Sequence, residues 1–121
     1  MTKSKYHNRK VVRDGMVFAS VKEYHRWLEL KMLERAGKIT ELQRQVPFLL
    51  IPTQRGEVWS DKKHKFVSRV VERSCSYVAD FVYLDDKCSR VVEDAKGLRT
   101  KEYIIKRKLM LERHGIRIRE V

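Results

Sequence analysis

Three acidic residues and one lysine stand at positions where their chemistry could matter. Asp80 lies within 77–83, a run of strand-forming residues in which aspartate is normally rare. Asp94 and Lys96 are two positions apart in a second such run, so on a strand both point to one face, about 6.8 Å apart. Glu23 falls in the first turn of a predicted helix. This set of residue types is typical of a metal-binding hydrolytic site.

Paired strands would bring two of these acids together. If the hairpin turn is centred near Asp86 and Lys87, Asp80 and Asp94 lie nearly opposite each other. Converging carboxylates repel, and each resists ionisation unless a cation joins them. Oxygen ligands suit Mg²⁺, for which Mn²⁺ can substitute, and such an ion binds phosphate oxygens and lowers the pKa of an attacking water. The ammonium group of Lys96 could hold that water and offset developing negative charge.

Each residue also has an alternative interpretation. Ser20 and Glu23 match a capping box, and a glutamate that caps a helix could not also bind a metal well. Asp80 could be an ordinary surface residue of a strand, and Asp94 and Lys96 could form a simple exposed ion pair. Glu93 could replace Asp94 as the functional acid, although strand alternation favours Asp94 because it shares a face with Lys96.

The elements that position these residues follow from apolar periodicity and turn signals. The N-terminal half predicts a hairpin over 11–18, a helix from Ser20 to Gly37, a strand over 39–51 with Pro47 at an edge or a bulge, and a polar loop over 52–65. The C-terminal half predicts a strand-rich stretch over 66–84 with a bulge or a break at 74–76, a strand over 90–96, a helix from Thr100 to Gly115 and a last strand over 116–118. After the hairpin, the order is α-β-β-β-α-β.

The composition indicates one globular domain that binds a polyanion. The chain has 121 residues, of which 42% are hydrophobic, and 28 Lys and Arg against 16 Asp and Glu give a net charge of +12. An anionic membrane surface and a ribosomal or packaging role are alternatives, but the positive charge is spread along the chain rather than held in tails. Residues 1–10 form a basic arm that would order on a partner. The cations predicted to contact nucleic acid are Lys5, Arg9, Lys10, Lys63, Lys101 and Lys106.

Several weaker signals complete the sequence. Trp59, in a basic stretch, could stack on a base or pack on its own domain. Cys75 and Cys88 have no metal-binding spacing and are expected to be reduced, and the histidines show no paired spacing either. We find no secretory signal and no apolar run of membrane length, which predicts a cytoplasmic protein without membrane contact.

Three segments resemble a known family. They are Phe18-Ala19-Ser20-Val21-Lys22-Glu23, Tyr77-Val78-Ala79-Asp80-Phe81 and Val91-Val92-Glu93-Asp94-Ala95-Lys96-Gly97. Together they are similar to small phage and prophage nucleases of the PD-(D/E)xK superfamily, a group similar to phage Holliday-junction resolvases. The likeness covers roughly residues 5–118. Ala79 stands where the motif name has proline.

The resemblance implies a fold and a function. The fold would be an α/β restriction-endonuclease-like core, with a central mixed sheet flanked by helices. Glu23, Asp80 and Asp94 would bind Mg²⁺, and these three with Lys96 would hydrolyse DNA in the cytoplasm of a bacterial host. Branched DNA would be a substrate, cut by a homodimer. The alternatives are a non-catalytic basic nucleic-acid-binding protein, an RNA nuclease or a nicking enzyme.

Overall fold

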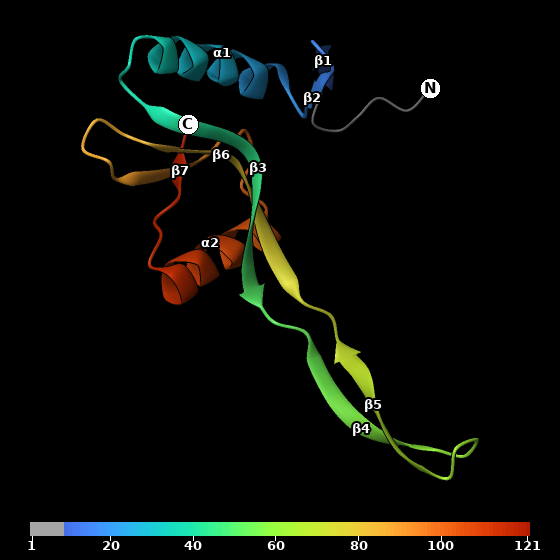
Figure 1. The fold of residues 1–121 in the computed structure, drawn as a ribbon. Coiled ribbons are helices and arrows are strands. Elements are labelled where there is room, and N and C mark those ends of the chain that lie inside the picture. Colours follow the sequence, from blue (N-terminus) through green and yellow to red (C-terminus); the bar gives the residue numbers. More distant parts are fainter. Residues whose placement is uncertain (1–8) are drawn as a thin grey trace. The chain divides into compact units, whose positions relative to one another are not determined.

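A computed structural model describes residues 9–121 as a mixed α/β structure with two helices (Figure 1). The chain divides into two compact units, of which the first comprises Met1–Val46, Ala79–Arg99 and Ile118–Val121 and the second Pro47–Val78 and Thr100–Arg117. Most of the basic arm predicted over 1–10, with Lys5, lies outside the described residues. Arg9 and Lys10 are described and exposed.

A four-stranded sheet of order β3-β6-β7-β8 is the central sheet. Its strands are β3 (Thr40–Ile51), β6 (Cys75–Leu84), β7 (Arg90–Asp94) and β8 (Arg119–Glu120). β7 pairs antiparallel with β6 and parallel with β8, so the sheet is mixed, as the sequence predicts. β3 is an edge strand, which suits Pro47 because proline has no N–H to donate to a neighbour.

The first unit opens with a tight hairpin and a capped helix. β1 (Val11–Arg13) pairs with β2 (Met16–Phe18), and both turn residues, Asp14 and Gly15, have positive φ, as predicted. The helix α1 (Val21–Arg35) begins after the N-cap Ser20 and ends in a Schellman motif at Gly37, whose φ is +73°. Both helix boundaries confirm the prediction.

The core of the first unit packs α1 against β6. Leu30, Ile39, Phe81 and Tyr83 form a buried cluster. The indole of Trp27 stacks on the ring of Phe81, with centroids 6.2 Å apart. This packing holds the part of β6 next to Asp80 against the helix that carries Glu23.

The second unit contains a hairpin and a helix. β4 (Gln54–Ser60) and β5 (Lys65–Glu72) pair antiparallel and lie side by side in Figure 1. The helix α2 (Lys101–His114) begins after its N-cap Thr100 and ends at Gly115, whose φ is +65°, as predicted. The imidazole of His114 lies 2.6 Å from the Leu49 carbonyl oxygen and contacts the ring of Phe48.

Three predicted boundaries are wrong. The segment 52–65 is not a loop but mainly β4 and the turn of the hairpin, because a two-stranded ribbon exposes both faces and leaves no apolar alternation to read. The strand predicted over 90–96 ends at Asp94, where the Ala95 N–H donates to the Asp80 carboxylate instead of continuing the β6 ladder. The last strand is Arg119–Glu120 rather than 116–118, because it forms only where it pairs with the end of β7.

Two smaller predictions are confirmed. The break between strands falls after Glu72, and β6 starts at Cys75. Cys75 and Cys88 are both free thiols. Among residues 9–121, neither helix has the length and apolar character needed to cross a bilayer.

Candidate active site

Asp80 and Asp94 face each other across the pair β6 and β7. The register pairs Phe81 with Glu93 and Val82 with Val92, and one step further along it Asp80 lies opposite Asp94. Asp94 is 3% exposed. One carboxylate oxygen of Asp80, Oδ2, accepts a hydrogen bond of 2.9 Å from the Ala95 N–H. The strand pairing therefore brings together two acids that lie fourteen positions apart, as the sequence predicts.

The surroundings of Asp80 disfavour its charge. Burial, the negative charge of Asp94 and that of Glu23 raise the pKa of Asp80 to about 7, while hydrogen bonds from the Ala95 N–H and the Gln45 amide oppose the rise. Its hydrogen-bond donors are uncharged, and both carboxylates act against its ionisation. A strongly perturbed acid beside other acids is typical of a functional site.

Glu23 belongs to the same cluster and also shapes the start of α1. The Ser20 hydroxyl accepts from the Glu23 N–H at 3.1 Å, as in a capping box. Oε2 of Glu23 accepts from the Ala19 N–H at 2.6 Å, one residue before the position that a capping box would use. The side chain is buried, at 2% exposed. Capping uses only Oε2 of Glu23. The predicted conflict between capping the helix and binding a metal is therefore partial, because Oε1 accepts from Gln45 instead.

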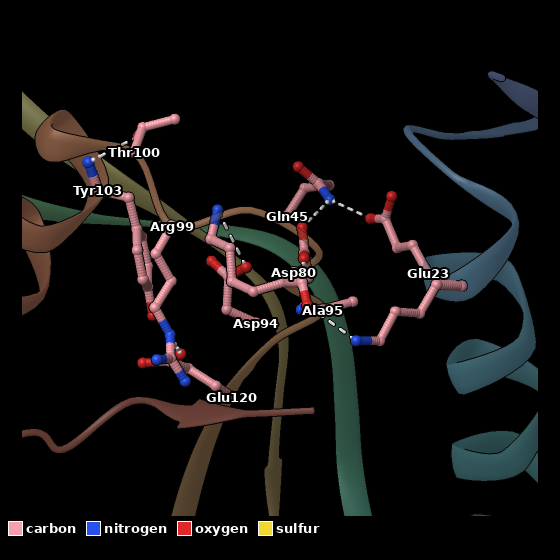
Figure 2. A network of polar contacts seen from close by, with 11 residues as sticks. Glu23, Gln45, Asp80, Asp94, Ala95, Arg99, Thr100, Tyr103 and Glu120 are labelled. Atoms are coloured by element: carbon pink, nitrogen blue, oxygen red, sulfur yellow. Dashed lines mark hydrogen bonds and ion pairs between the residues drawn. The ribbon is translucent and has the colours of Figure 1, made fainter. Parts of the chain in front are cut away.

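Gln45 links Glu23 to Asp80, and no pattern in the sequence predicts this role. Its Nε2 donates to Oε1 of Glu23 at 2.9 Å and to Oδ1 of Asp80 at 3.2 Å (Figure 2). Gln45 has a φ of +52°, a left-handed conformation that side chains other than glycine rarely adopt. Backbone strain of this kind often accompanies functional sites. A glutamine on an edge strand is ordinary by residue type, so no sequence signal could have found it.

Lys96 reaches the cluster from just beyond the end of β7. Its Nζ lies 3.2 Å from Oδ1 of Asp94. Its backbone N–H donates to the Val121 carbonyl at 3.3 Å, and its own carbonyl accepts from Nζ of Lys22 at 2.8 Å. These contacts fix the segment after β7. Lys96 therefore contacts Asp94 even though β7 ends at Asp94 and does not include Lys96.

A basic hollow of about 530 Å³ lies beside Lys96. It is lined by three cations, Lys22, Lys96 and Arg99, together with Glu120 and three uncharged residues, Gly97, Leu98 and Val121. Arg99 forms an ion pair with Glu120. Nζ of Lys22 donates to the Lys96 carbonyl and Nζ of Lys96 lies beside Asp94, so the lining carries three cations against one acid. This hollow has the chemistry of an anion-binding surface.

Glu93, the alternative motif acid, lies in a different environment. Its carboxylate receives two hydrogen bonds from the Arg26 guanidinium, at 2.8 and 2.7 Å, and a short one from the Tyr83 hydroxyl. Burial and the contact with Glu93 raise the pKa of Tyr83 to about 12, and the same carboxylate raises that of Arg26. The structure therefore places Asp94, not Glu93, beside Asp80 and Lys96.

The four predicted catalytic residues converge unequally. Lys96 contacts Asp94 directly, Asp94 acts on Asp80 through its charge from the neighbouring strand, and Glu23 is linked to Asp80 through the Gln45 amide. Within residues 9–121, no three His, Cys, Asp or Glu side chains are grouped closely enough to hold a metal ion in this arrangement. Arg44, whose guanidinium lies 4.0 Å from Oε1 of Glu23, is a further charged neighbour.

The predicted nucleic-acid contacts are distributed over both units. Lys63 lies exposed in the turn between β4 and β5. On α2, Lys101 is exposed, whereas Lys106 is half-buried and forms an ion pair of 3.2 Å with Glu102. Lys106 therefore has the partner expected on an ordinary solvent-exposed helix face.

Comparison with known proteins gives one family. The model of the family described as "Protein of unknown function (DUF1064)" matches residues 3–120. The chain belongs to this family. No curated protein matches it, and no solved structure does. Because the DUF1064 match spans Glu23, Gln45, Asp80, Asp94 and Lys96, the whole candidate site lies within the shared region.

Proposed function

We propose that the chain is a metal-dependent endonuclease of the PD-(D/E)xK superfamily, with a restriction-endonuclease-like core, that hydrolyses phosphodiester bonds in DNA. The observation that carries the proposal is the meeting of Asp80 and Asp94 across paired strands, with Nζ of Lys96 3.2 Å from Asp94. The three side chains combine two acids with one cation, and the basic hollow lies next to the lysine.

The donor set fits a hard divalent cation such as Mg²⁺ or Mn²⁺. Asp80 and Asp94 would hold it, because a cation between them would relieve the repulsion that raises the pKa of Asp80. Glu23 would become a third ligand by exchanging its hydrogen bond from Gln45 for the ion. When bound, the ion would supply a Lewis acid that lowers the pKa of a water and neutralises a phosphate oxygen.

The lysines have separate tasks in this proposal. Lys96 would hold the attacking water beside the acids and offset charge that develops on the phosphate, as its contact with Asp94 allows. Lys22 would bind a neighbouring phosphate from the hollow. Arg99 would contribute only after leaving Glu120, with which it pairs.

The finer proposal concerns the substrate. The net charge of +12 favours a polyanion, and the similarity of three segments to phage nucleases points to branched DNA in the cytoplasm of a bacterial host. Resolving a four-way junction takes two symmetric cuts, so a homodimer would be the working unit. RNA and nicked duplex are the substrates to compare with it.

The experiment is a cleavage assay with the full chain and four labelled substrates: a four-way junction, a linear duplex, a nicked duplex and an RNA hairpin. We expect cutting with Mg²⁺ or Mn²⁺, no cutting in EDTA, and binding without turnover in Ca²⁺, whose looser coordination positions a water poorly. Asp86→Asn is the matched control for Asp94→Asn, because it makes the same change at an exposed turn residue.

The outcomes separate the alternatives. Cutting in EDTA, or by the Asp94→Asn variant at the control rate, would exclude the proposed mechanism. DNA binding without cutting under any of the metals would favour the non-catalytic binding protein. Equal cutting of the junction and the linear duplex by a monomer would remove the branched-DNA proposal and leave a general nuclease.

A further inference from the structure

The outer end of the β4–β5 hairpin carries a second feature that the carboxylate cluster does not explain. We infer that Trp59 and Phe66 form a stacking site for unpaired bases of a nucleic acid, with Lys62, Lys63 and Lys65 binding the adjacent phosphates. This end of the hairpin lies wholly within the second unit. The inference is independent of the cleavage chemistry and concerns where a strand is bound.

The two aromatic side chains are a directly opposed pair. Trp59 and Phe66 are register partners on β4 and β5, so both rings lie on the same face of the hairpin. Their centroids are 5.3 Å apart and their planes make an angle of 76°, an edge-to-face contact. The ring that contributes its edge keeps both of its faces out of the pair. The contact therefore orders the rings without covering them.

Both rings are unusually exposed for their size. Trp59 is 52% exposed and Phe66 is 63% exposed. The indole N–H donates to Oδ1 of Asp61 at 3.0 Å, so the polar group of Trp59 already has a partner within the turn. What remains open is apolar π surface. Exposed apolar surface of this kind marks an interaction site more often than a fold requirement.

The turn beside the rings is basic. Lys62, Lys63 and Lys65 are all exposed, and they lie between Trp59 and Phe66 in the sequence. Ser60, 8% exposed, accepts a hydrogen bond of 3.2 Å from the Lys63 N–H and orders the turn that carries them. Aromatic faces next to lysines fit a nucleic-acid strand, since bases stack on rings and phosphates pair with ammonium groups.

A second copy of this chain fits the surface less well. Two such hairpin ends packed on each other would bring two sets of three lysines together on chains that each carry a net charge of +12. A regular duplex also fits less well, because its bases are stacked on each other and offer no free face. Unpaired nucleotides supply both the free faces and the negative charge.

The test measures binding in EDTA, where no cleavage occurs under the proposed function. The full chain is titrated with a labelled single strand of thymidines and with a duplex of equal length. We expect Trp59→Leu and Phe66→Leu each to weaken single-strand binding about 5- to 150-fold, with little effect on the duplex. Trp59→Phe keeps a ring and should retain most of the affinity.

Matched controls separate stacking from charge and from folding. Val70→Ala alters another exposed apolar residue on the same face of the hairpin and should bind like the unaltered chain. Lys63→Ala should lower the slope of log affinity against log salt by about 0.7, whereas Trp59→Leu should leave that slope unchanged. Trp27 is partly buried against the core of the first unit, so its emission reports folding of that unit in the Trp59 variants, and circular dichroism reports folding of the whole chain.

Two results would overturn the inference. One is single-strand affinity that Trp59→Leu leaves unchanged, or that Val70→Ala weakens equally. The other is a Trp59→Leu variant that loses self-association in sedimentation but keeps its single-strand affinity. The aromatic pair would then join two copies of the chain rather than bind a nucleic acid. Cleavage retained by Asp94→Asn, with single-strand binding intact, would overturn only the proposed function.

Discussion

Glu93 and Asp94 are adjacent residues of β7, and both are buried, yet their surroundings differ in charge. Glu93 meets a guanidinium through two hydrogen bonds and a hydroxyl through a third. Asp94 lies opposite a second acid and within 3.2 Å of one ammonium group. The first arrangement cancels the buried charge, whereas the second leaves an excess of negative charge on the pair of acids.

The difference teaches how to separate a structural carboxylate from a functional one. Arg26 neutralises Glu93 and satisfies both of its oxygens. In the neighbouring cluster, Gln45 satisfies oxygens of Glu23 and Asp80 but brings no charge. A neutral amide can therefore hold two acids in place while the cluster still favours a cation. The comparison predicts that changes on the two sides of β7 will affect different properties.

The largest expected effect is on catalysis. Asp94→Asn and Lys96→Ala should each lower the cleavage rate by about 10³-fold or more, because the cluster is proposed to act as one unit. Circular dichroism and DNA affinity should change little, since neither side chain belongs to the apolar core. Rates with Mg²⁺ on one duplex measure the effect, and Asp86→Asn is the control. Activity that survives in Asp94→Asn but not in Glu93→Gln would reverse the assignment.

The next largest effect is on stability and comes from Glu93, the neighbour of Asp94 on β7. Glu93→Ala should lower the free energy of unfolding by about 1–3 kcal/mol, because it removes the buried carboxylate that accepts from Arg26 and Tyr83 and leaves Arg26 only its pair with the exposed Glu29. Urea denaturation measures this. Arg26→Ala combined with Glu93→Ala should lose less than the two single changes added together, because they remove the same interaction. Additive losses would show that the two residues stabilise the protein separately.

A third effect is on the pH dependence of stability. The folded-state pKa of Asp80, about 7, lies above its ordinary value of 3.8, so its contribution is most favourable below pH 3.8 and is lost as pH rises through 7. Without added metal, Asp80→Asn should therefore raise the free energy of unfolding at pH 8 by about 1–3 kcal/mol. Near pH 4 the gain should vanish. Denaturation at the two pH values, with and without Mg²⁺, measures this effect.

Added Mg²⁺ should have the opposite effect on stability to the ionisation of Asp80. Mg²⁺ should stabilise the unaltered chain at pH 8 and have little effect on Asp80→Asn, since ligand that binds only the folded state adds to stability. If Asp80→Asn raised the free energy of unfolding equally at pH 4 and pH 8, the ionisation of Asp80 would not be the cause of the gain.

The parts of the site that sequence could predict are those set by local rules. Helix caps and strand alternation placed Glu23, Asp80 and Asp94 correctly, because each depends on near neighbours in the chain. Lys96 was expected on the strand, yet it lies past the end of β7, where the Val121 carbonyl accepts from its N–H. Gln45 was missed because its role depends on a positive φ and on two acids distant in sequence.

The fold divides in the same way. Turn residues and caps predicted the N-terminal hairpin and both helices, since Gly15, Gly37 and Gly115 each occupy a conformation with positive φ. β4 and the turn that follows it were taken for a loop, because the exposed faces of β4 mix Val58, Trp59 and charged residues without a pattern. β4 is a strand because it pairs with β5, not because one of its faces is buried. Local hydrophobic periodicity does not predict pairing of this kind.

The smallest effect expected in the comparison comes from Gln45. Gln45→Ala removes a hydrogen bond that lowers the pKa of Asp80, so less of that acid is ionised near neutral pH. We expect cleavage to fall about tenfold at pH 6.5, from the combined loss of ionised Asp80 and of positioning, and the deficit to shrink toward pH 9 as Asp80 ionises in both proteins. Gln43→Ala, an exposed glutamine two residues earlier on β3, is the matched control.

Gln45→Lys makes the same position resemble Arg26 by adding the missing positive charge. The new ammonium should lower the pKa of Asp80, since an opposite charge favours its ionised form. The same charge should compete with a metal ion, so cleavage should need a higher Mg²⁺ concentration even though Asp80 is ionised at lower pH. Rates measured against pH and against Mg²⁺ for the alanine and lysine variants separate these effects. If both variants lose the same activity at every pH and Mg²⁺ concentration, Gln45 only holds β3 in shape, and the contrast between a neutral and a charged partner does not govern the two clusters.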